Sequence, residues 1–452
     1  MKTITAPGHI LLILRRLKDN GHAAYLVGGC VRDAVMGRSM REWDITTSAA
    51  PLDVARLFRD AVMIGAKFGT VTVSIPRFAT ATTSQKQDDS PKAENGNNRR
   101  SEDLASIDEG RFNRDDVDDV QVTTFRTEEE YLDGRHPSRV EFVSTLDEDL
   151  SRRDFTINAM ACTISGRIID LFGGIDDINK RIIRCVGDSV TRISEDALRM
   201  FRAYRFSAEL GFEIEPESLH AIHENAQAAC RISPERVREE LEKTLISQKP
   251  EITGEMIQCG LLDRYLKRHA KSNERHDDSE IQTLRPRSDG AAVNLVTLKS
   301  LSKLPPEPLL RWCVFCAIML DNGLVAATAD ILRELHIDEK TVRSCTMALS
   351  ITVFPQNRAA IKRLLAKHGI DAVRCAAAIC AAQNDGSALQ ATDEIIQSGE
   401  CFTRCKLAIS GKDLIQRGIA PGPEIGKTLD EMVKYVIDYP EKNTREILLD
   451  ML

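Results

Sequence analysis

Hydrophobic positions over the first 125 residues follow two different spacings. Residues 7–21, "PGHILLILRRLKDNG", repeat apolar side chains at helical spacing up to a glycine, which predicts a helix. A second, shorter helix is expected at "VRDAVMG" (31–37), which also ends on a glycine. Runs rich in β-forming residues predict strands at "AAYLVGG" (23–29), "EWDITTS" (42–48), "TVTVSI" (70–75) and "VQVTTF" (120–125). The pattern therefore predicts a small mixed α/β sheet with helices.

The pattern changes near Asp149, after which apolar positions recur at helical spacing almost to the C-terminus. We expect an α/β head over 1–148, followed by an all-α neck over 149–265 and an all-α body and tail over 293–452. Two polar stretches without periodicity interrupt this order. The stretch at about 79–118 is predicted to be a disordered insertion between two strands of the head, and 266–292 a polar linker.

The composition says more about the cellular compartment than about the fold. The 452 residues contain no apolar run of about 18 residues, and the N-terminus lacks the residue order of a signal peptide, so we expect a cytoplasmic protein without a membrane partner. The Cys313–Cys316 pair has no second pair and lies in an apolar run, so we interpret it as core residues rather than a zinc or redox site. Most of the net charge of −7 lies in 79–120, with 11 acidic and 6 basic residues, and therefore says little about a nucleic-acid partner.

Glu42 and Asp44 are two acids separated by one tryptophan in a predicted strand. Because side chains alternate along a strand, both carboxylates are expected on one face, about 7 Å apart. Such a pair can hold hard divalent cations through oxygen ligands, as phosphoryl and nucleotidyl transfer require. Gly28 and Gly29, at the end of the preceding strand, would let backbone N–H groups approach a triphosphate. A solvated strand face beside an ordinary glycine turn explains this segment equally well by itself.

A pair of adjacent arginines opens the segment "RRDFTINAMA" (152–161). The guanidiniums of Arg152 and Arg153 can bind phosphate in a bidentate manner, and the amide of Asn158 can bond a ribose hydroxyl. The alternative is a helix start with a structural ion pair.

The segment "SEDALRMFRAYRF" (194–206) predicts a helix on which Asp196, Arg199 and Arg202 share a face. A carboxylate beside a guanidinium offers an acceptor next to a donor, which matches the pairing edges of cytosine and adenine and not those of uracil and guanine. The alternative is an ordinary salt bridge between residues three apart.

These segments together resemble the class II tRNA nucleotidyltransferase and poly(A) polymerase family, whose motifs include GGxVRD, a DxD pair, RRDxxxN and EDxxR. Glu42 departs from the pattern, because the family usually has an aspartate there. A carboxylate one methylene longer is still an oxygen ligand. The resemblance implies nucleotide contacts by Gly28, Gly29, Arg32, Arg152, Arg153, Asp154, Asn158, Asp196, Arg199 and Arg202.

Two further segments match the same family. "FRTEEEYLDGRHPSRVEF" (125–142) resembles the flexible loop that CCA-adding and A-adding members keep and CC-adding members lack, with Asp133 and Arg135 as its expected functional residues. "SPERVREELEKTL" (233–245) resembles the neck motif, with Arg236, Glu240 and Lys243 at the matching positions.

The resemblance implies an enzyme that adds CCA to the 3′ acceptor end of tRNA from CTP and ATP and releases pyrophosphate. Glu42 and Asp44 would be the catalytic ligands of a two-metal Mg²⁺ site. Three alternatives stay open: an A-adding enzyme, a poly(A) polymerase, and a catalytically weakened RNA-binding relative. The last is suggested by Glu42 and by Gln121, which stands where many members carry a glutamate; an amide has no charge and cannot act as a base.

Overall fold

The computed structural model describes residues 3–40, 42–77, 117–128, 140–266, 298–383 and 386–452, which form two compact units. The first unit runs to Arg199 and includes 212–225, whereas the second holds 200–211 and the chain from Ala226 onward. Among the described residues, no helix is both long and apolar enough to cross a membrane.

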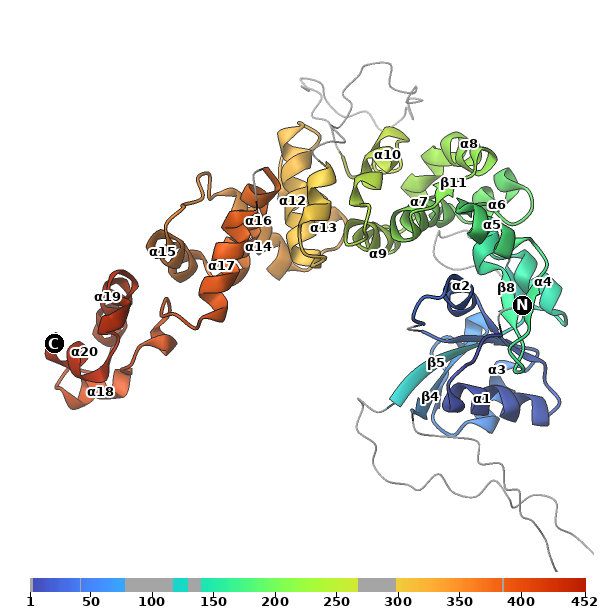
Figure 1. The fold of residues 1–452 in the computed structure, drawn as a ribbon, viewed down its shortest axis with the longest axis horizontal. Helices are drawn as coiled ribbons and strands as arrows, with labels where there is room; N and C mark the ends of the chain where they lie inside the picture. Colours follow the sequence, from blue (N-terminus) through green and yellow to red (C-terminus); the bar gives the residue numbers. More distant parts are fainter. Residues whose placement is uncertain (1–2, 41, 78–116, 129–139, 267–297, 384–385) are drawn as a thin grey trace, which may run out of the picture. The chain divides into compact units, whose positions relative to one another are not determined.

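A seven-stranded mixed sheet forms the centre of the first unit (Figure 1). Its strand order is β3-β4-β5-β2-β1-β8-β9, and the pairing of β2 with β5 is parallel while the others are antiparallel. The strands are β1 (Ala24–Val27), β2 (Asp44–Thr47), β3 (Ala61–Val62), β4 (Thr70–Pro76), β5 (Val117–Thr124), β8 (Met160–Cys162) and β9 (Ile168–Asp170). Two small sheets pair β6 (Arg126–Glu128) with β7 (Val140–Phe142), and β10 (Ile182–Ile183) with β11 (Glu213–Ile214).

Helices accompany this sheet in the first unit, where α1 and α3 contact each other and also contact strands of the sheet (Figure 1). The helices are α1 (Gly8–Asp19), α2 (Gly29–Met36), α3 (Pro51–Leu57), α4 (Leu146–Ser151), α5 (Gly174–Lys180), α6 (Ser189–Glu195) and α8 (Pro216–Asn225). In α1 the residues Ile10, Ile13, Leu14 and Leu17 are fully buried, so the apolar spacing in the sequence is the buried face of the helix. The mixed α/β fold predicted for the head is confirmed.

The structure corrects three details of the sequence prediction. Strand β2 begins at Asp44, so Glu42 and Trp43 precede the strand instead of lying in it. Strands β8 and β9 continue the sheet past residue 148, where only helices were expected; each is three residues long, too short to give a periodic pattern. Strand β5 begins at Val117, inside the stretch predicted as an insertion. The strands flanking that stretch do pair directly, Pro76 with Val117, whereas 78–116 lie outside the described residues.

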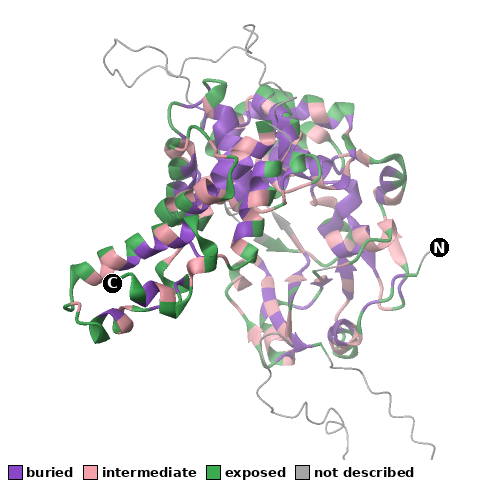
Figure 2. Cartoon of the chain, turned by 60° about the vertical axis from the view of Figure 1, so that its left-hand side comes forward, coloured by how far each residue is buried: buried purple, intermediate pink, exposed green. Residues whose placement is uncertain are grey.

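The second unit is helical, and α7 (Leu198–Leu210) leads into it from the first. Buried residues gather where its helices face one another, and exposed residues line their outer sides (Figure 2). Its helices are α9 (Pro234–Leu245), α10 (Thr253–Gln258), α12 (Pro308–Asp321), α13 (Thr328–Glu334), α14 (Glu339–Leu349), α15 (Arg358–His368), α16 (Ile370–Gln383), α17 (Ser387–Gln397), α18 (Gly411–Gln416), α19 (Pro423–Asp438) and α20 (Arg445–Asp450).

Arg311 is a cation inside the core of the second unit, only 3% exposed. Its guanidinium donates hydrogen bonds to the carbonyl oxygens of Leu245 and Leu304, both at 2.7 Å, and of Pro305 at 3.0 Å. Leu245 is the last residue of α9, whose final carbonyls have no partner inside the helix. Burial lowers the pKa of Arg311, which stays charged because these carbonyls replace water around it.

Replacing Arg311 with methionine should destabilise the second unit by about 2–4 kcal/mol, because buried carbonyls lose their donors. The free energy of urea unfolding can be followed through the fluorescence of Trp312, the adjacent residue, in a Trp43→Phe background. As a control, Arg333→Met removes an arginine that is 58% exposed and pairs with Glu339, and it should leave the unfolding free energy nearly unchanged. Equal effects of the two substitutions would contradict a structural role for Arg311.

Candidate active site

The end of β1 and the start of β2 bring the first predicted motifs together. Val27, the last residue of β1, pairs with Asp44, so Gly28 follows directly beside that carboxylate. Gly28 has φ 72° and ψ −133°, a conformation that side-chain-bearing residues avoid. A Cβ at this position would lie 3.3 Å from Nη1 of Arg153 and 3.9 Å from Oδ2 of Asp44. The glycine therefore permits the close approach of a carboxylate and a guanidinium that are far apart in sequence.

Asp44 and Glu42 interact although only Asp44 lies in the strand. Burial raises the pKa of the Asp44 carboxyl, the Arg153 charge lowers it, and the Glu42 charge raises it further. Gln121 of β5 pairs with Asp44, so its exposed side chain lies on the same face of the sheet. Two carboxylates and an amide oxygen make a donor set of hard oxygen atoms, which fits a divalent cation such as those of nucleotidyl transfer.

Asp149, which the sequence analysis did not single out, organises the two arginines. It lies in α4, is fully buried, and accepts hydrogen bonds from Nη2 of Arg152 at 2.8 Å and Nη2 of Arg153 at 3.2 Å. The hydroxyl of Thr46 donates to it at 3.1 Å, and the backbone N–H of Arg126 at 3.4 Å. Burial alone would raise the pKa of Asp149, but the charges and hydrogen bonds of the two arginines hold it below its usual value.

Thr46 lies two residues after Asp44 in β2, so both side chains project from the same face of the sheet. Because Thr46 bonds Asp149, that carboxylate and its arginines lie over the face that carries Asp44. Nε of Arg153 is buried without a hydrogen-bond partner among the described residues, so this guanidinium keeps donor capacity beside the carboxylates. The spacing of Asp149, three and four residues before the arginines, was a signal in the sequence that could have revealed it.

A second network joins the GGxVRD and RRDxxxN segments. Nη1 of Arg32, from α2, donates to Oδ1 of Asn158 at 2.8 Å, and Nε donates to Asp33 at 2.9 Å. The amide of Asn158 donates in turn to Asp154 at 3.1 Å, and Asp154 accepts the N–H of Phe155 at 2.8 Å. Gly29 begins α2, where a Cβ would lie 3.7 Å from Nη2 of Arg32. All these residues belong to the first unit, where the two motifs meet although Arg32 and Asn158 are 126 positions apart in the sequence.

Asp196 does not lie on a helix with Arg199, contrary to the prediction. It follows α6 in an extended conformation, and its carboxylate accepts the N–H of Leu198 at 3.0 Å, at the start of α7. This bond satisfies a free donor of the helix N-terminus, which explains why the helix starts after Asp196. Nη1 of Arg199 contacts Glu195 at 2.6 Å, and Nη2 donates to the carbonyl of Arg152 at 2.9 Å. Asp196 and Arg199 are both buried, and Arg199 is held from two sides and contacts the backbone of Arg152.

The remaining predicted residues lie in the second unit or outside the described residues. Arg202 contacts Glu240 at 3.7 Å and covers the ring of Phe206. Glu240 of α9 is buried and also pairs with Arg205 of α7, so it links these two helices. On the same helix Arg236 is half-buried and Lys243 is exposed. Asp133 and Arg135 of the expected flexible loop lie outside the described residues.

Comparison with known proteins places most of this chain in described families. Residues 24–116 and 108–184 match the poly A polymerase head domain, and 310–452 match a domain described as tRNA nucleotidyltransferase domain 2, putative. Residues 211–272 match a domain described as the probable RNA and SrmB-binding site of polymerase A.

Relatives of known name match nearly the whole chain. The CCA-adding enzyme of Limosilactobacillus fermentum is 33% identical over 449 residues, covering 97% of this chain and 94% of the relative. The crystal structure of the Bacillus stearothermophilus CCA-adding enzyme in complex with CTP superposes with a TM-score of 0.68 at 29% identity, covering 99% and 97% of the two chains. The Thermotoga maritima CCA-adding enzyme complexed with tRNA-CCA shares the fold, with a TM-score of 0.55 and 18% identity over 97% and 93% of the two chains. This chain belongs to the family of CCA-adding enzymes, the tRNA nucleotidyltransferases with a poly A polymerase head domain.

Proposed function

We propose that this protein adds C, C and A to the 3′ end of tRNA without a nucleic-acid template. In this reaction the terminal tRNA hydroxyl attacks the α-phosphate of CTP or ATP, a new phosphodiester bond forms, and pyrophosphate leaves. The observation that carries the proposal is the meeting of Asp44 and Arg153 at Gly28, in a chain that matches CCA-adding enzymes over nearly its whole length. A relative that is 29% identical was solved in complex with CTP, which supports the nucleotide.

Glu42 and Asp44 are proposed to hold two Mg²⁺ ions through their carboxylate oxygens, with Gln121 beside them. When bound, such ions lower the pKa of an attacking hydroxyl and offset charge on the phosphate. Glu42 precedes β2, and its side chain is one methylene longer than that of aspartate. The extra length helps its carboxylate to approach Asp44 from outside the strand. The neutral amide of Gln121 adds an oxygen donor without adding repulsion to the two acids.

Arg152 and Arg153 are proposed to bind the triphosphate on the side of Asp44. The unpartnered Nε of Arg153 and the positive charge of the pair fit a polyanion that arrives with its own metal ions. The N–H groups at the start of α2, after Gly28 and Gly29, can add backbone donors. Arg32, Asp154 and Asn158 are then suited to the ribose, since they already form one hydrogen-bonded chain.

Asp196 and Arg199 are proposed to select the base through an acceptor and a donor at its pairing edge. The contact between Arg199 and the carbonyl of Arg152 supports this, because it ties the base-selecting residue to the phosphate-binding pair. Arg202 is proposed to support the nucleotide site without selecting the base, since Glu240 holds it within the helical neck.

The neck, body and tail are proposed to bind the acceptor end of tRNA through phosphate contacts, with Arg236 and Lys243 of α9 among them. Asp133 and Arg135 are proposed to act from the loop near the incoming nucleotide. We further propose ATP as the second substrate and the cytoplasm as the site of action. The division into head (1–148), neck (149–265) and body with tail (293–452) is proposed as a functional one, although the sheet itself continues to β9.

In the direct test, the purified protein is incubated with tRNA that lacks CCA, ends in C or ends in CC. Each nucleotide is supplied singly, in the presence of Mg²⁺. CTP alone should extend tRNA lacking CCA to CC, and ATP alone should add one A to tRNA ending in CC. Growth only on tRNA ending in CC would identify an A-adding enzyme, and long A tracts a polymerase. Retained tRNA binding without incorporation in Mg²⁺ or Mn²⁺ would identify a catalytically inactive RNA-binding relative.

Asp149→Asn should lower kcat/KM for CTP about 10²-fold, because Arg152 and Arg153 lose the charge that positions them. Because the folded pKa of Asp149 is lowered, its ionised form stabilises the fold above the ordinary carboxyl pKa and loses that effect as pH falls below it. The difference in unfolding free energy between wild type and variant should therefore shrink below about pH 4. The exposed neighbour Asp147, changed to Asn, provides the control, and an equal loss of kcat/KM in both variants would remove Asp149 from this role.

Asp196→Ala should relax base choice more than it weakens tRNA binding. The ratio of kcat/KM for CTP to that for UTP should fall at least ~10²-fold, because the acceptor that rejects uracil is lost. Asp196→Asn keeps the shape and distinguishes lost chemistry from a disturbed helix start. Ser194→Ala, on the neighbouring helix end, should leave the ratio unchanged. If Asp196→Ala lowers the rate with both nucleotides equally, the residue supports the fold and does not select the base.

A further inference from the structure

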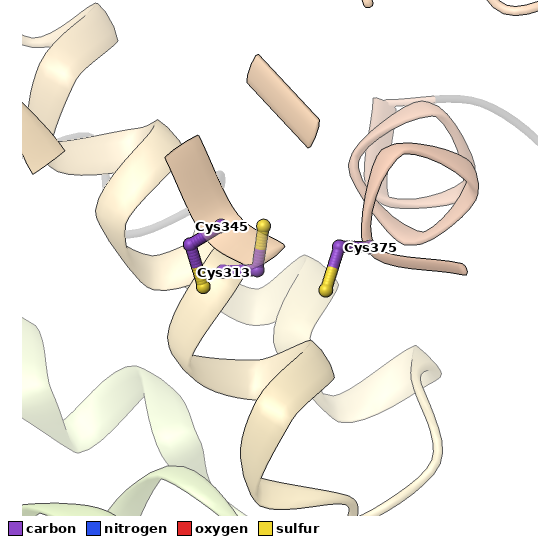
Figure 3. A group of neighbouring side chains, drawn as sticks. All are labelled: Cys313, Cys345 and Cys375. Carbon is purple, nitrogen blue, oxygen red and sulfur yellow. The ribbon is translucent and has the colours of Figure 1, made fainter. Parts of the chain in front are cut away.

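Three cysteines from three helices meet inside the second unit (Figure 3). Cys313 lies on α12, Cys345 on α14 and Cys375 on α16, and their sulfur atoms all lie within 4.8 Å of one another. Each residue is 0% exposed. The sequence offered only the pair Cys313 and Cys316; the structure instead groups Cys313 with two cysteines that are distant in the chain.

The cluster offers sulfur as its ligand atom. The three helices pack against one another, and no histidine or carboxylate within the described residues joins the three sulfur atoms. The surrounding helix faces are apolar, with Phe315, Val342 and Val373 buried on α12, α14 and α16. Hard cations such as Mg²⁺ and Ca²⁺ prefer oxygen ligands, so this site fits a soft, thiophilic element.

The number of ligands and their charge further limit which element the site can bind. Zinc prefers four ligands in a tetrahedron, whereas these three cysteines are buried away from the bulk water that could supply a fourth. Three thiolates around a cation of charge one or two leave a net negative charge in a dry, apolar interior, which is unfavourable. A trivalent element with three thiolates leaves no net charge. Arsenous acid, As(OH)₃, is also uncharged, so it can enter a core during local opening of the helices.

We propose that Cys313, Cys345 and Cys375 form a three-coordinate binding site for a trivalent thiophilic element, with arsenic(III) as its probe. In the binding step three S–H and three As–OH bonds break, three S–As bonds form, and three water molecules leave. Arsenic stays trivalent throughout, so no oxidant or reductant is needed. The product cross-links α12, α14 and α16 and should stabilise the second unit by restricting the unfolded chain.

To test this, the purified protein is incubated with sodium arsenite, and its mass is measured under native conditions. Wild type should gain one arsenic atom and lose three hydrogen atoms, and its thermal unfolding should shift upward. Cys313→Ala, Cys345→Ala and Cys375→Ala should each lose this adduct. Cys316→Ala is the matched control, because Cys316 is equally buried one helical turn from Cys313; it should keep both the adduct and the shift.

Several results would overturn the proposal. They are an adduct that persists in Cys345→Ala, an adduct lost in Cys316→Ala, and arsenic bound in wild type only at the exposed Cys230 or Cys405. A larger thermal shift with Zn²⁺ or Cu(I) than with arsenite would overturn the choice of a trivalent element. Should an alanine variant fail to fold, alkylation mapping of wild type still decides: arsenite must slow modification of the three proposed cysteines relative to Cys316.

Discussion

The candidate active site depends on one buried carboxylate. Asp149 has no exposed side-chain surface, and an isolated charge in such a place is strongly unfavourable, so its partners must stay where they are. Those partners are Arg152 and Arg153, which follow Asp149 at the C-terminal end of α4, and Thr46 from the central strand β2. Satisfying this single charge therefore fixes two guanidiniums over the face of the sheet that carries Asp44.

A second constraint comes from the space around Gly28. The sheet order places β2, β1 and β8 side by side, which brings the segments around residues 28, 44 and 158 to one end of the sheet. Arg153 can approach Asp44 there because Gly28 lacks a side chain and adopts a positive φ. The hydrogen bonds from Arg32 to Asn158 and from Asn158 to Asp154 border the same region on the side of α2. Negative oxygens and positive nitrogens are thus held close together before any nucleotide arrives, which limits reorganisation on binding.

The sequence predicted the parts of this site that depend on local pattern. The α1 helix and the strands β1, β4 and β5 agree with the patterns and spacings of the sequence. The sequence could not predict the features set by distant contacts. Asp196 leaves the helix because its carboxylate bonds the N–H of Leu198, and β8 and β9 are too short to show alternation. The grouping of Cys313 with Cys345 and Cys375 depends on helix packing, which single-sequence periodicity does not encode.

We propose that Glu42, Asp44, Arg152 and Arg153 form one site for a metal-bound nucleoside triphosphate. A crystal structure of the protein with Mn²⁺ and a non-hydrolysable CTP analogue tests it most directly, since anomalous scattering locates manganese independently of the protein. Manganese is expected at Glu42 and Asp44, with the triphosphate contacting Arg152 and Arg153. Manganese or triphosphate bound away from these residues would contradict it.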